Sequence, residues 1–178
     1  LHLSLPELSG ERYSAYISKE ITLERDRLGS AIVTGNNRKD VAYGLGFAHG
    51  QDRFFQMDLL RRNSAGELAE IFGEKALSLD KHRRFHQFRK RAEGIVANMP
   101  MTQKKLLQAY ANGVNDALTE QSISSFEYLL TGAKPKVWIP ADSLLVIYSM
   151  YLDLQDKTVT RDMVLTQIKR RYGKDMLA

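Results

Sequence analysis

The stretch AYGLGFAHGQDRFFQMDLLRR, residues 42–62, decides how this chain is expected to fold. Apolar side chains recur there at helical spacing, which predicts an amphipathic helix with one face toward a core. Asp52 falls on that apolar face, and we expect it to be paired because a bare buried carboxylate is costly. The apolar face comprises Val41, Leu45, Ala48, Phe55 and Leu59. The stretch therefore predicts a central packed helix that carries a structural salt bridge.

Glycines and a hairpin pattern frame this helix. Each glycine inside a helix costs about 1 kcal/mol relative to alanine, so glycines here indicate close backbone packing. They are Gly44, Gly46 and Gly50. Before the stretch, alternating residues with a turn at 26–29 predict a β-hairpin over residues 17–34. Asp40 then stands where the N-cap of the long helix is expected.

Further helices are predicted after the stretch, so that a helical region extends over residues 40–173. Pro140 and Asp142 are expected to open one apolar helix, and a separate last helix is expected over residues 160–172. The sequence contains no internal repeat or domain-sized linker, so residues 1–178 are interpreted as a single unit. The predicted fold class is mainly α with a β-hairpin. Because a lone hairpin is marginal in water and needs a sheet to join, the pattern indicates part of a larger fold.

Composition excludes several functional classes. The absence of cysteine excludes disulfides, thiolate zinc sites and cysteine nucleophiles. The net charge is +5, but the densest basic stretch, residues 81–91, is interpreted as the solvated face of a helix whose apolar face includes Phe85, Phe88 and Ala92. Without a groove-entering motif, nucleic-acid binding is not expected. Membrane insertion is not expected either, since no apolar run approaches the roughly 20 residues of a membrane span.

The sequence offers no catalytic constellation. No serine lies in a Gly-x-Ser-x-Gly motif that could pair with one of the four histidines. His82 and His86 have metal-ligand spacing on a helix, but the glutamate of the zinc-protease motif and a third ligand are missing. The pair Gly44 and Gly46 lacks the third glycine of a dinucleotide-binding loop. We therefore expect no catalytic residue on this chain and no organic cofactor.

The apolar helix around residues 143–153 carries two side chains suited to a pocket. Met150 and Leu154 are four residues apart, so they project from one face and fit either an adaptable apolar pocket or ordinary core packing. Asp153 lies between them among apolar residues, and it needs a charged partner or a position at a rim. Spacing alone leaves the pocket and the core alternatives open.

Three motifs resemble the A-chain, the small chain, of the penicillin acylase family. The first is the stretch at residues 42–62, which is followed by AGELAEIFG at residues 65–73. The others are AYANGVNDAL at residues 109–118 and KPKVWIPADSLLV at residues 134–146. Their order and spacing agree with the family over residues 18–173. Three motifs in the right order form a specific signature.

The resemblance implies an α+β Ntn-hydrolase αββα sandwich, completed in a heterodimer that arises by autocatalytic cleavage of one precursor. In this family the nucleophile is a serine at the first position of the larger B-chain, which also provides the oxyanion hole. A chain that begins with Leu1 does not supply that serine, so the B-chain is the implied partner. The resemblance also implies a periplasmic or secreted location, although the first residues here show no signal-peptide pattern.

Site residues are also implied by the resemblance. The methionine, arginine and phenylalanine of the family's acyl-group pocket fall on Met150, Asp153 and Leu154, so only the methionine is retained. The two replacements put a preference for phenylacetyl groups in doubt and suit an aliphatic acyl chain. The family's calcium-binding glutamate on this chain falls on Asp162, a shorter hard oxygen donor expected in the first turn of the last helix.

The implied function is the small chain of a penicillin-acylase-like amidohydrolase, which hydrolyses an acyl–amine amide bond in a small-molecule substrate. An acyl-homoserine lactone acylase is the alternative within the same fold, because its fatty amide substrate favours an aliphatic pocket. A non-catalytic helical binding or scaffold module is the alternative from another class. It explains the absence of a nucleophile without a second chain.

Overall fold

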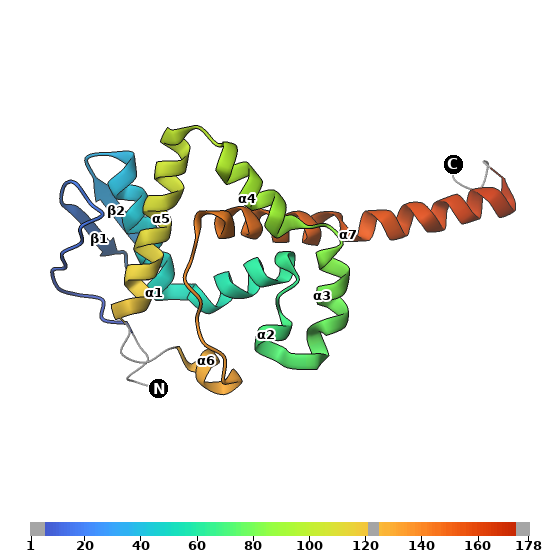
Figure 1. Ribbon diagram of the computed structural model, residues 1–178, viewed down its shortest axis with the longest axis horizontal. Coiled ribbons are helices and arrows are strands. Elements are labelled where there is room, and N and C mark those ends of the chain that lie inside the picture. The colour runs from blue at the N-terminus through green and yellow to red at the C-terminus, as the bar shows by residue number, and fades with distance from the viewer. Residues whose placement is uncertain (1–5, 121–124, 174–178) are drawn as a thin grey trace.

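The computed structural model describes residues 6–120 and 125–173, apart from the side chains of residues 156–158. Helices surround a central helix, a hairpin lies at one end, and half of the last helix projects from the other end (Figure 1). The elements in chain order are β1 (Ile21–Arg25), β2 (Ala31–Gly35), α1 (Arg38–Ala65), α2 (Ala69–Phe72), the 3₁₀-helix η2 (Gly73–Ala76), α3 (Leu77–Arg84), α4 (Phe88–Asn98), α5 (Met101–Glu120), α6 (Phe126–Thr131) and α7 (Pro140–Tyr172). The mainly helical fold class with a hairpin is confirmed.

The hairpin forms where the alternating pattern predicted it. β1 and β2 pair antiparallel, with Leu23 opposite Val33 at the centre of the register. The turn is stabilised by Asp26, whose carboxylate accepts the backbone N–H groups of Leu28 and Ser30, both at 2.8 Å. Gly29 completes it with a φ of 82°, in the left-handed region that glycine adopts without strain. These two strands are the only sheet in the described part of the chain.

Close backbone packing explains the glycines of α1, as predicted. A Cβ on Gly46 would lie 2.1 Å from the Tyr110 carbonyl oxygen, and one on Gly113 would lie 2.0 Å from the Tyr43 carbonyl oxygen. These contacts bring the backbones of α1 and α5 together. Gly44 faces the hairpin instead, where a Cβ would lie 2.7 Å from a methyl carbon of Val33. The glycine-rich half of α1 is therefore held between α5 and the hairpin.

The buried face of α1 is not the one that was predicted. Arg53 has non-helical backbone angles, with φ −152° and ψ 31°, but buried residues recur every three or four positions on both sides of this kink. Of the predicted apolar face only Ala48 is buried and Leu45 is exposed, whereas Phe47, Phe54 and Met57 are buried. Asp52 is paired as expected, but at a partly exposed position.

The partner of Asp52 comes from the hairpin. The guanidinium of Arg25 donates to both oxygens of the Asp52 carboxylate, over 3.0 and 2.7 Å. Such a two-pronged contact fixes orientation as well as charge. The ion pair therefore joins the hairpin to α1 one residue before the kink.

The start of α1 differs from the prediction in its N-cap. Asn37 is the N-cap, since its side chain accepts the N–H of Asp40. Asp40 is buried and accepts the backbone N–H groups of Ser18 and Lys19 at 3.1 and 3.0 Å. Burial raises the pKa of Asp40, but these hydrogen bonds and those from the Ser18 and Asn37 side chains lower it to about 2. Asp40 thus ties the segment before β1 to the helix.

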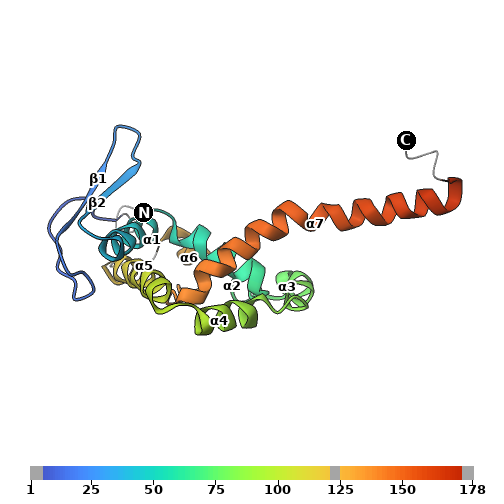
Figure 2. The same cartoon turned by 90° about the horizontal axis from the view of Figure 1, so that it is seen from above.

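Helix α7 is one continuous helix, so the separate last helix that was predicted is wrong. Its 33 residues correspond to about 50 Å at 1.5 Å per residue. The first part lies against α1 and α4, and the second part extends beyond the other helices (Figure 2). Within the described residues, no helix is long and apolar enough to cross a membrane.

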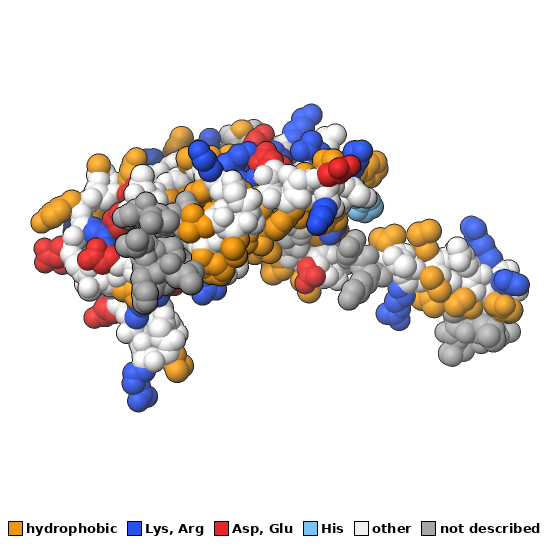
Figure 3. All heavy atoms as spheres, turned by 90° about the horizontal axis from the view of Figure 1, so that it is seen from below, with side chains coloured by type: hydrophobic (Ala, Val, Ile, Leu, Met, Phe, Trp, Pro, Cys, Tyr) orange, Lys and Arg blue, Asp and Glu red, His pale blue; other side chains and the backbone are white. Residues whose placement is uncertain are grey.

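Hydrophobic side chains are exposed along the projecting part of α7 and on the face of the body seen in the same view (Figure 3). On the helix these exposed side chains include Val159, Met163, Val164 and Tyr172. The buried core lies elsewhere, in two clusters. One surrounds Trp138 between α1, α5 and α6, and the other surrounds Leu145 between α1, α4 and α7.

Candidate functional site

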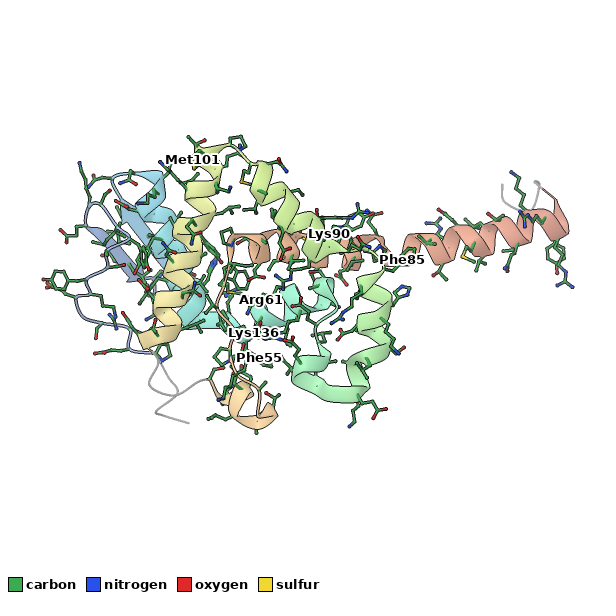
Figure 4. The ribbon with its side chains drawn as sticks, in the orientation of Figure 1. Phe55, Arg61, Phe85, Lys90, Met101 and Lys136 are labelled. Carbon is green, nitrogen blue, oxygen red and sulfur yellow. The ribbon has the colours of Figure 1, made fainter. Side chains whose placement is uncertain are left out.

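The base of α7 is fixed by a buried ionic cluster centred on Arg61. The guanidinium donates to Asp58 at 2.7 Å and to Asp142 at 2.5 Å. It also donates to the carbonyl oxygens of Lys136 and Val137, at 2.8 and 3.0 Å. Arg61 is 3% exposed, so its charge is compensated entirely inside the protein. Figure 4 shows Arg61 in the middle of the body, close to Lys136.

Asp142 connects this cluster to the first turn of α7. One carboxylate oxygen accepts from Arg61 and from the backbone N–H of Ile139 at 2.9 Å. The other accepts from Arg89 of α4 at 2.6 Å. Arg89 in turn forms a two-pronged contact with Glu67. The prediction that Asp142 opens a helix is confirmed, and the residue also binds two arginines.

The segment before α7 is held by α5. Asn115 accepts the Trp138 N–H at 2.7 Å and donates to the Trp138 carbonyl at 2.9 Å. The Trp138 ring is buried, and the Arg61 guanidinium lies over it, 4.9 Å from the ring centre. The motifs at residues 42–62, 109–118 and 134–146 therefore meet at one place and fix the base of α7.

The second carboxylate of the cluster is Asp58. It accepts from Arg61, from Arg62 at 2.9 Å and from the Tyr128 hydroxyl at 2.6 Å. Burial raises the pKa of Tyr128, and the bond to Asp58 raises it further, so the hydroxyl remains a donor. This cluster was not predicted from the sequence, where Asp52 was the one carboxylate of residues 42–62 expected to form a buried ion pair. The spacing of Asp58 from Arg61 and Arg62, three and four residues, was a signal that could have revealed it.

The first half of α7 has two unlike faces. The buried face consists of Ala141 and of Asp142, Leu145, Ser149 and Leu152, the last four of which recur every three or four residues. On the opposite side, Met150 is 58% and Leu154 is 69% exposed. Ile147 and Tyr151 accompany them on that side and are also exposed. Core packing of Met150 and Leu154, one of the two alternatives, is therefore not what this chain shows.

The predicted site residues are only partly brought together. Met150, Asp153 and Leu154 lie within two turns of α7, and Asp153 is exposed, in keeping with a position at a rim. Asp162 lies nine residues beyond Asp153, which is about 14 Å along the helix. It is far from the first turn of α7, which begins at Pro140, so the expected contribution of the helix dipole at Asp162 is wrong.

The histidines do not form a catalytic or metal site in the described part of the chain. His49 is hydrogen-bonded to the Tyr110 hydroxyl at 2.9 Å. Burial, and to a smaller extent the positive charge of Arg53, lowers the pKa of the His49 ring. His82 and His86 lie edge to face, 6.3 Å apart. No group of three or more His, Cys, Asp or Glu residues among the described residues could hold a metal ion. His2 lies outside the described residues.

Comparison with known proteins gives consistent matches. Penicillin acylase 2 proenzyme of Pseudomonas sp. (strain SE83) is 34% identical over 147 residues, which is 83% of this chain and 19% of that protein. Penicillin G acylase of Escherichia coli is 29% identical, over 96% of this chain and 20% of that protein. An acyl-homoserine lactone acylase of Pseudomonas putida is 28% identical, over 98% of this chain and 22% of that protein. The chain thus spans about a fifth of the length of these curated relatives.

A solved structure and a family profile complete the comparison. The thermostable penicillin G acylase from Alcaligenes faecalis matches with a TM-score of 0.73 at 22% identity, over 90% of this chain and 88% of that chain. This likeness shows that the chain shares the fold of the matched chain of that acylase. The profile described as penicillin amidase matches residues 20–178. Because that match covers nearly all of the sequence, this chain belongs to the penicillin amidase family.

Proposed function

We propose that this chain is the small chain of a two-chain amidohydrolase whose larger chain carries an N-terminal serine nucleophile. One observation carries the proposal. The chain spans about a fifth of its curated relatives, yet it covers 88% of one chain of the solved acylase. A match to nearly all of one chain of a solved acylase supports the assignment to the corresponding chain of a related enzyme.

The exposed apolar side chains of α7 support a second chain. A surface helix normally keeps one face polar, but the projecting part of α7 exposes Val159, Met163, Val164 and Tyr172. Contiguous exposed apolar surface of this kind marks an interaction site. The two-stranded hairpin also lacks a sheet to join within the described residues. A larger chain would cover the helix and extend the sheet.

In the proposed enzyme, Met150 and Leu154 line the acyl-group pocket and Asp153 lies at its rim. All three are exposed side chains on a helix whose base is held rigidly by the Arg61 cluster. The serine of the larger chain attacks the amide carbonyl, the amine leaves, and water then hydrolyses the acyl-enzyme ester. This chain contributes to binding of the acyl group and supplies none of the bond-making groups.

An acyl-homoserine lactone acylase is the second candidate. Leu154 is an aliphatic side chain at the exposed pocket position, and relatives with that activity in their names match 98% of this chain. The family membership and these relatives support a hydrolase over a scaffold module. We also expect a periplasmic or secreted location, as in penicillin acylases.

The experiment is expression of the full precursor, followed by assay of two chromogenic amides, the para-nitroanilides of phenylacetic and decanoic acids. Hydrolysis of either amide by a purified two-chain protein supports the proposal. Preference for the decanoyl amide favours the lactone acylase. A two-chain protein that hydrolyses neither these amides nor an acyl-homoserine lactone contradicts the proposed function.

Leu154→Phe tests the pocket within the same assay. Shape changes in an apolar pocket alter discrimination by about 1–3 kcal/mol, or roughly 10- to 200-fold. The variant is expected to shift the ratio of kcat/KM for the two amides while the melting temperature stays nearly constant, because Leu154 is exposed in this chain. An unchanged ratio would remove Leu154 from the pocket.

We further propose that Asp162 contributes one oxygen ligand to a calcium ion held between the chains. Its exposed carboxylate is a hard donor of the right class, but calcium needs about six to eight oxygens, so most ligands would come from the larger chain. Chelation is then expected to lower the melting temperature of the two-chain protein, and Asp162→Asn to abolish that sensitivity. Wild-type protein that is insensitive to a strong chelator would exclude the metal.

A further inference from the structure

Three polar contacts join the end of α1 to the buried face of α7. The first is the bond from Arg61 to Asp142 in the first turn. In the second, the Ser64 hydroxyl donates to the Leu145 carbonyl at 2.8 Å. In the third, the Asn63 side-chain amide donates to the Ser149 hydroxyl at 3.0 Å. Together they follow α7 over two turns along the end of α1.

Among the described side chains, the hydrogen bond between Asn63 and Ser149 is the last one that joins α7 to the body before the helix projects. Ser149 is 3% exposed, and after it only Leu152 is buried in the described part of the helix. Ser149 immediately precedes Met150 and lies five residues before Leu154. The hydroxyl therefore acts at the boundary between the anchored part of α7 and the exposed face that carries the proposed pocket residues.

A small rotation of α7 at this boundary would matter for an acyl pocket. A helix with its side chains has a radius of about 5–6 Å, so a rotation of about 20° displaces a side-chain end by roughly 2 Å. That displacement exceeds the length of one methylene group. The buried face opposite Met150 contains small or apolar residues here, so the hydrogen bond at Ser149 provides directional restraint that packing of Leu145 and Leu152 does not.

We propose that Ser149, held by Asn63, is a positioning residue that sets the rotation of α7 and thereby the acyl-group selectivity of the enzyme. The inference rests on the proposed function, because it assumes that Met150 and Leu154 contact the acyl group. Ser149 itself lies on the opposite face of the helix and touches no substrate. Its contribution is to fix the positions of the Met150 and Leu154 side chains.

The test uses the two-chain protein made from the precursor and the ratio of kcat/KM for decanoyl and phenylacetyl para-nitroanilides. Ser149→Ala removes the hydroxyl and is expected to change this ratio about three- to tenfold, below the roughly 10- to 200-fold ceiling for a change of shape inside the pocket. Most of the change is expected in KM, since the reacting groups lie on the other chain. Asn63→Ala, at a partly exposed position, is expected to give the same shift.

Two further variants separate positioning from general loosening. Ser64→Ala removes a buried hydroxyl bond of the same kind one turn earlier, and it is expected to leave the ratio within twofold. Asn63→Asp is expected to keep the wild-type ratio of kcat/KM, because the Ser149 hydroxyl can donate a hydrogen bond to the new carboxylate. The double variant of Asn63→Ala and Ser149→Ala is expected to shift the ratio no further than either single variant, as for two partners in one contact.

Three outcomes would overturn the inference. An unchanged ratio in both Ser149→Ala and Asn63→Ala would do so while leaving the proposed function intact, provided that the wild type hydrolyses an amide. An equal shift in Ser64→Ala would show that loosening of α7 anywhere has the same effect. Wild-type protein without amidase activity would remove the proposed function and this inference together. If Ser149→Ala does not fold, the ratios of kcat/KM for Asn63→Ala and Asn63→Asp provide the same test.

Discussion

The two halves of α7 are built from the same kind of helix but are held in opposite ways. In the first half, five residues are buried, and Asp142 alone accepts hydrogen bonds from Arg61, from Arg89 and from the backbone N–H of Ile139. In the second half, the side chains at described positions from Val159 onward are exposed or only partly covered. One half is stabilised by contacts within this chain, and the other half depends on what covers it.

The two halves of α7 differ in what stabilises them. Buried charges are costly unless every partner is present, so the Arg61 cluster gives a unique position to the base of α7. The exposed apolar side chains of the second half contribute no hydrophobic stabilisation while they remain in water. The chain therefore fixes the first half of α7 by its own contacts and leaves apolar side chains exposed along the second half.

The largest effect is expected from Arg61→Ala in the two-chain protein. Removing one partner of a buried ionic cluster costs about 3–5 kcal/mol, because Asp58 and Asp142 would be left with uncompensated charge. Urea unfolding measures the loss. Lys136→Ala is the matched control: its pair with Glu70 is largely exposed, and exposed pairs contribute about 0–1 kcal/mol. Equal losses for the two variants would mean that the cluster does not anchor α7.

Met163→Ala addresses the projecting half. Full burial of a methionine side chain contributes about 1.5–3 kcal/mol, so the variant is expected to weaken the two-chain protein by up to that amount. Met163 is 60% exposed in this chain, and little of that cost arises from contacts within the chain. The free energy of unfolding of the two-chain protein is the measurement. A loss below about 0.5 kcal/mol, typical of surface substitutions, would indicate that the projecting part of α7 stays in solvent.

Gly46→Ala tests the packing of α1 on α5. The added methyl would lie 2.1 Å from the Tyr110 carbonyl oxygen, and overpacking of this kind costs about 1–3 kcal/mol. Gly94→Ala in α4 is the control, since nothing lies within 4 Å of the added carbon. There the higher helix propensity of alanine is expected to stabilise the protein by up to about 1 kcal/mol. Thermal unfolding of both variants should give shifts of opposite sign.

The smallest effect is a pH dependence at Asp40. Its pKa is about 2 in the folded chain against an ordinary value of 3.8, so folding favours the ionised carboxylate. The resulting stability is present above about pH 5 and is lost as the pH falls from about 4 to 2. Asp40→Asn is expected to flatten this part of the stability profile. A variant profile that still runs parallel to the wild type below pH 4 would assign the acid sensitivity to other groups.

Local features of the fold could be predicted from the sequence, and the contacts between distant segments could not. The hairpin, the close packing at Gly46 and the helix start at Asp142 each depend on a few neighbouring residues. The wrong face of α1 was predicted because the buried face also contains Gly50, Asp58 and Arg61, which a search for apolar spacing assigns to solvent. The continuity of α7 was missed because polar and β-branched residues between 155 and 160 reduce helix propensity without breaking the helix.

In the candidate site, too, local features could be predicted and contacts between distant segments could not. The pairing of Met150 with Leu154 on one face followed from helical spacing, and both are exposed together. The contacts that hold this face, from Arg61 to Asp142 and from Asn63 to Ser149, join residues 81 and 86 positions apart. Sequence periodicity contains no information on such pairs. The assignment of Asp162 as a ligand stays a prediction.

The N-terminal sequence of the larger polypeptide in the mature protein tests the central claim most directly. The precursor should be expressed, purified without added protease, and separated into its chains under denaturing conditions. We predict a second, larger polypeptide that co-purifies with this chain and begins with serine. A fully active protein that remains one uncleaved polypeptide, or a larger chain that begins with a residue bearing no nucleophilic side chain, would contradict it.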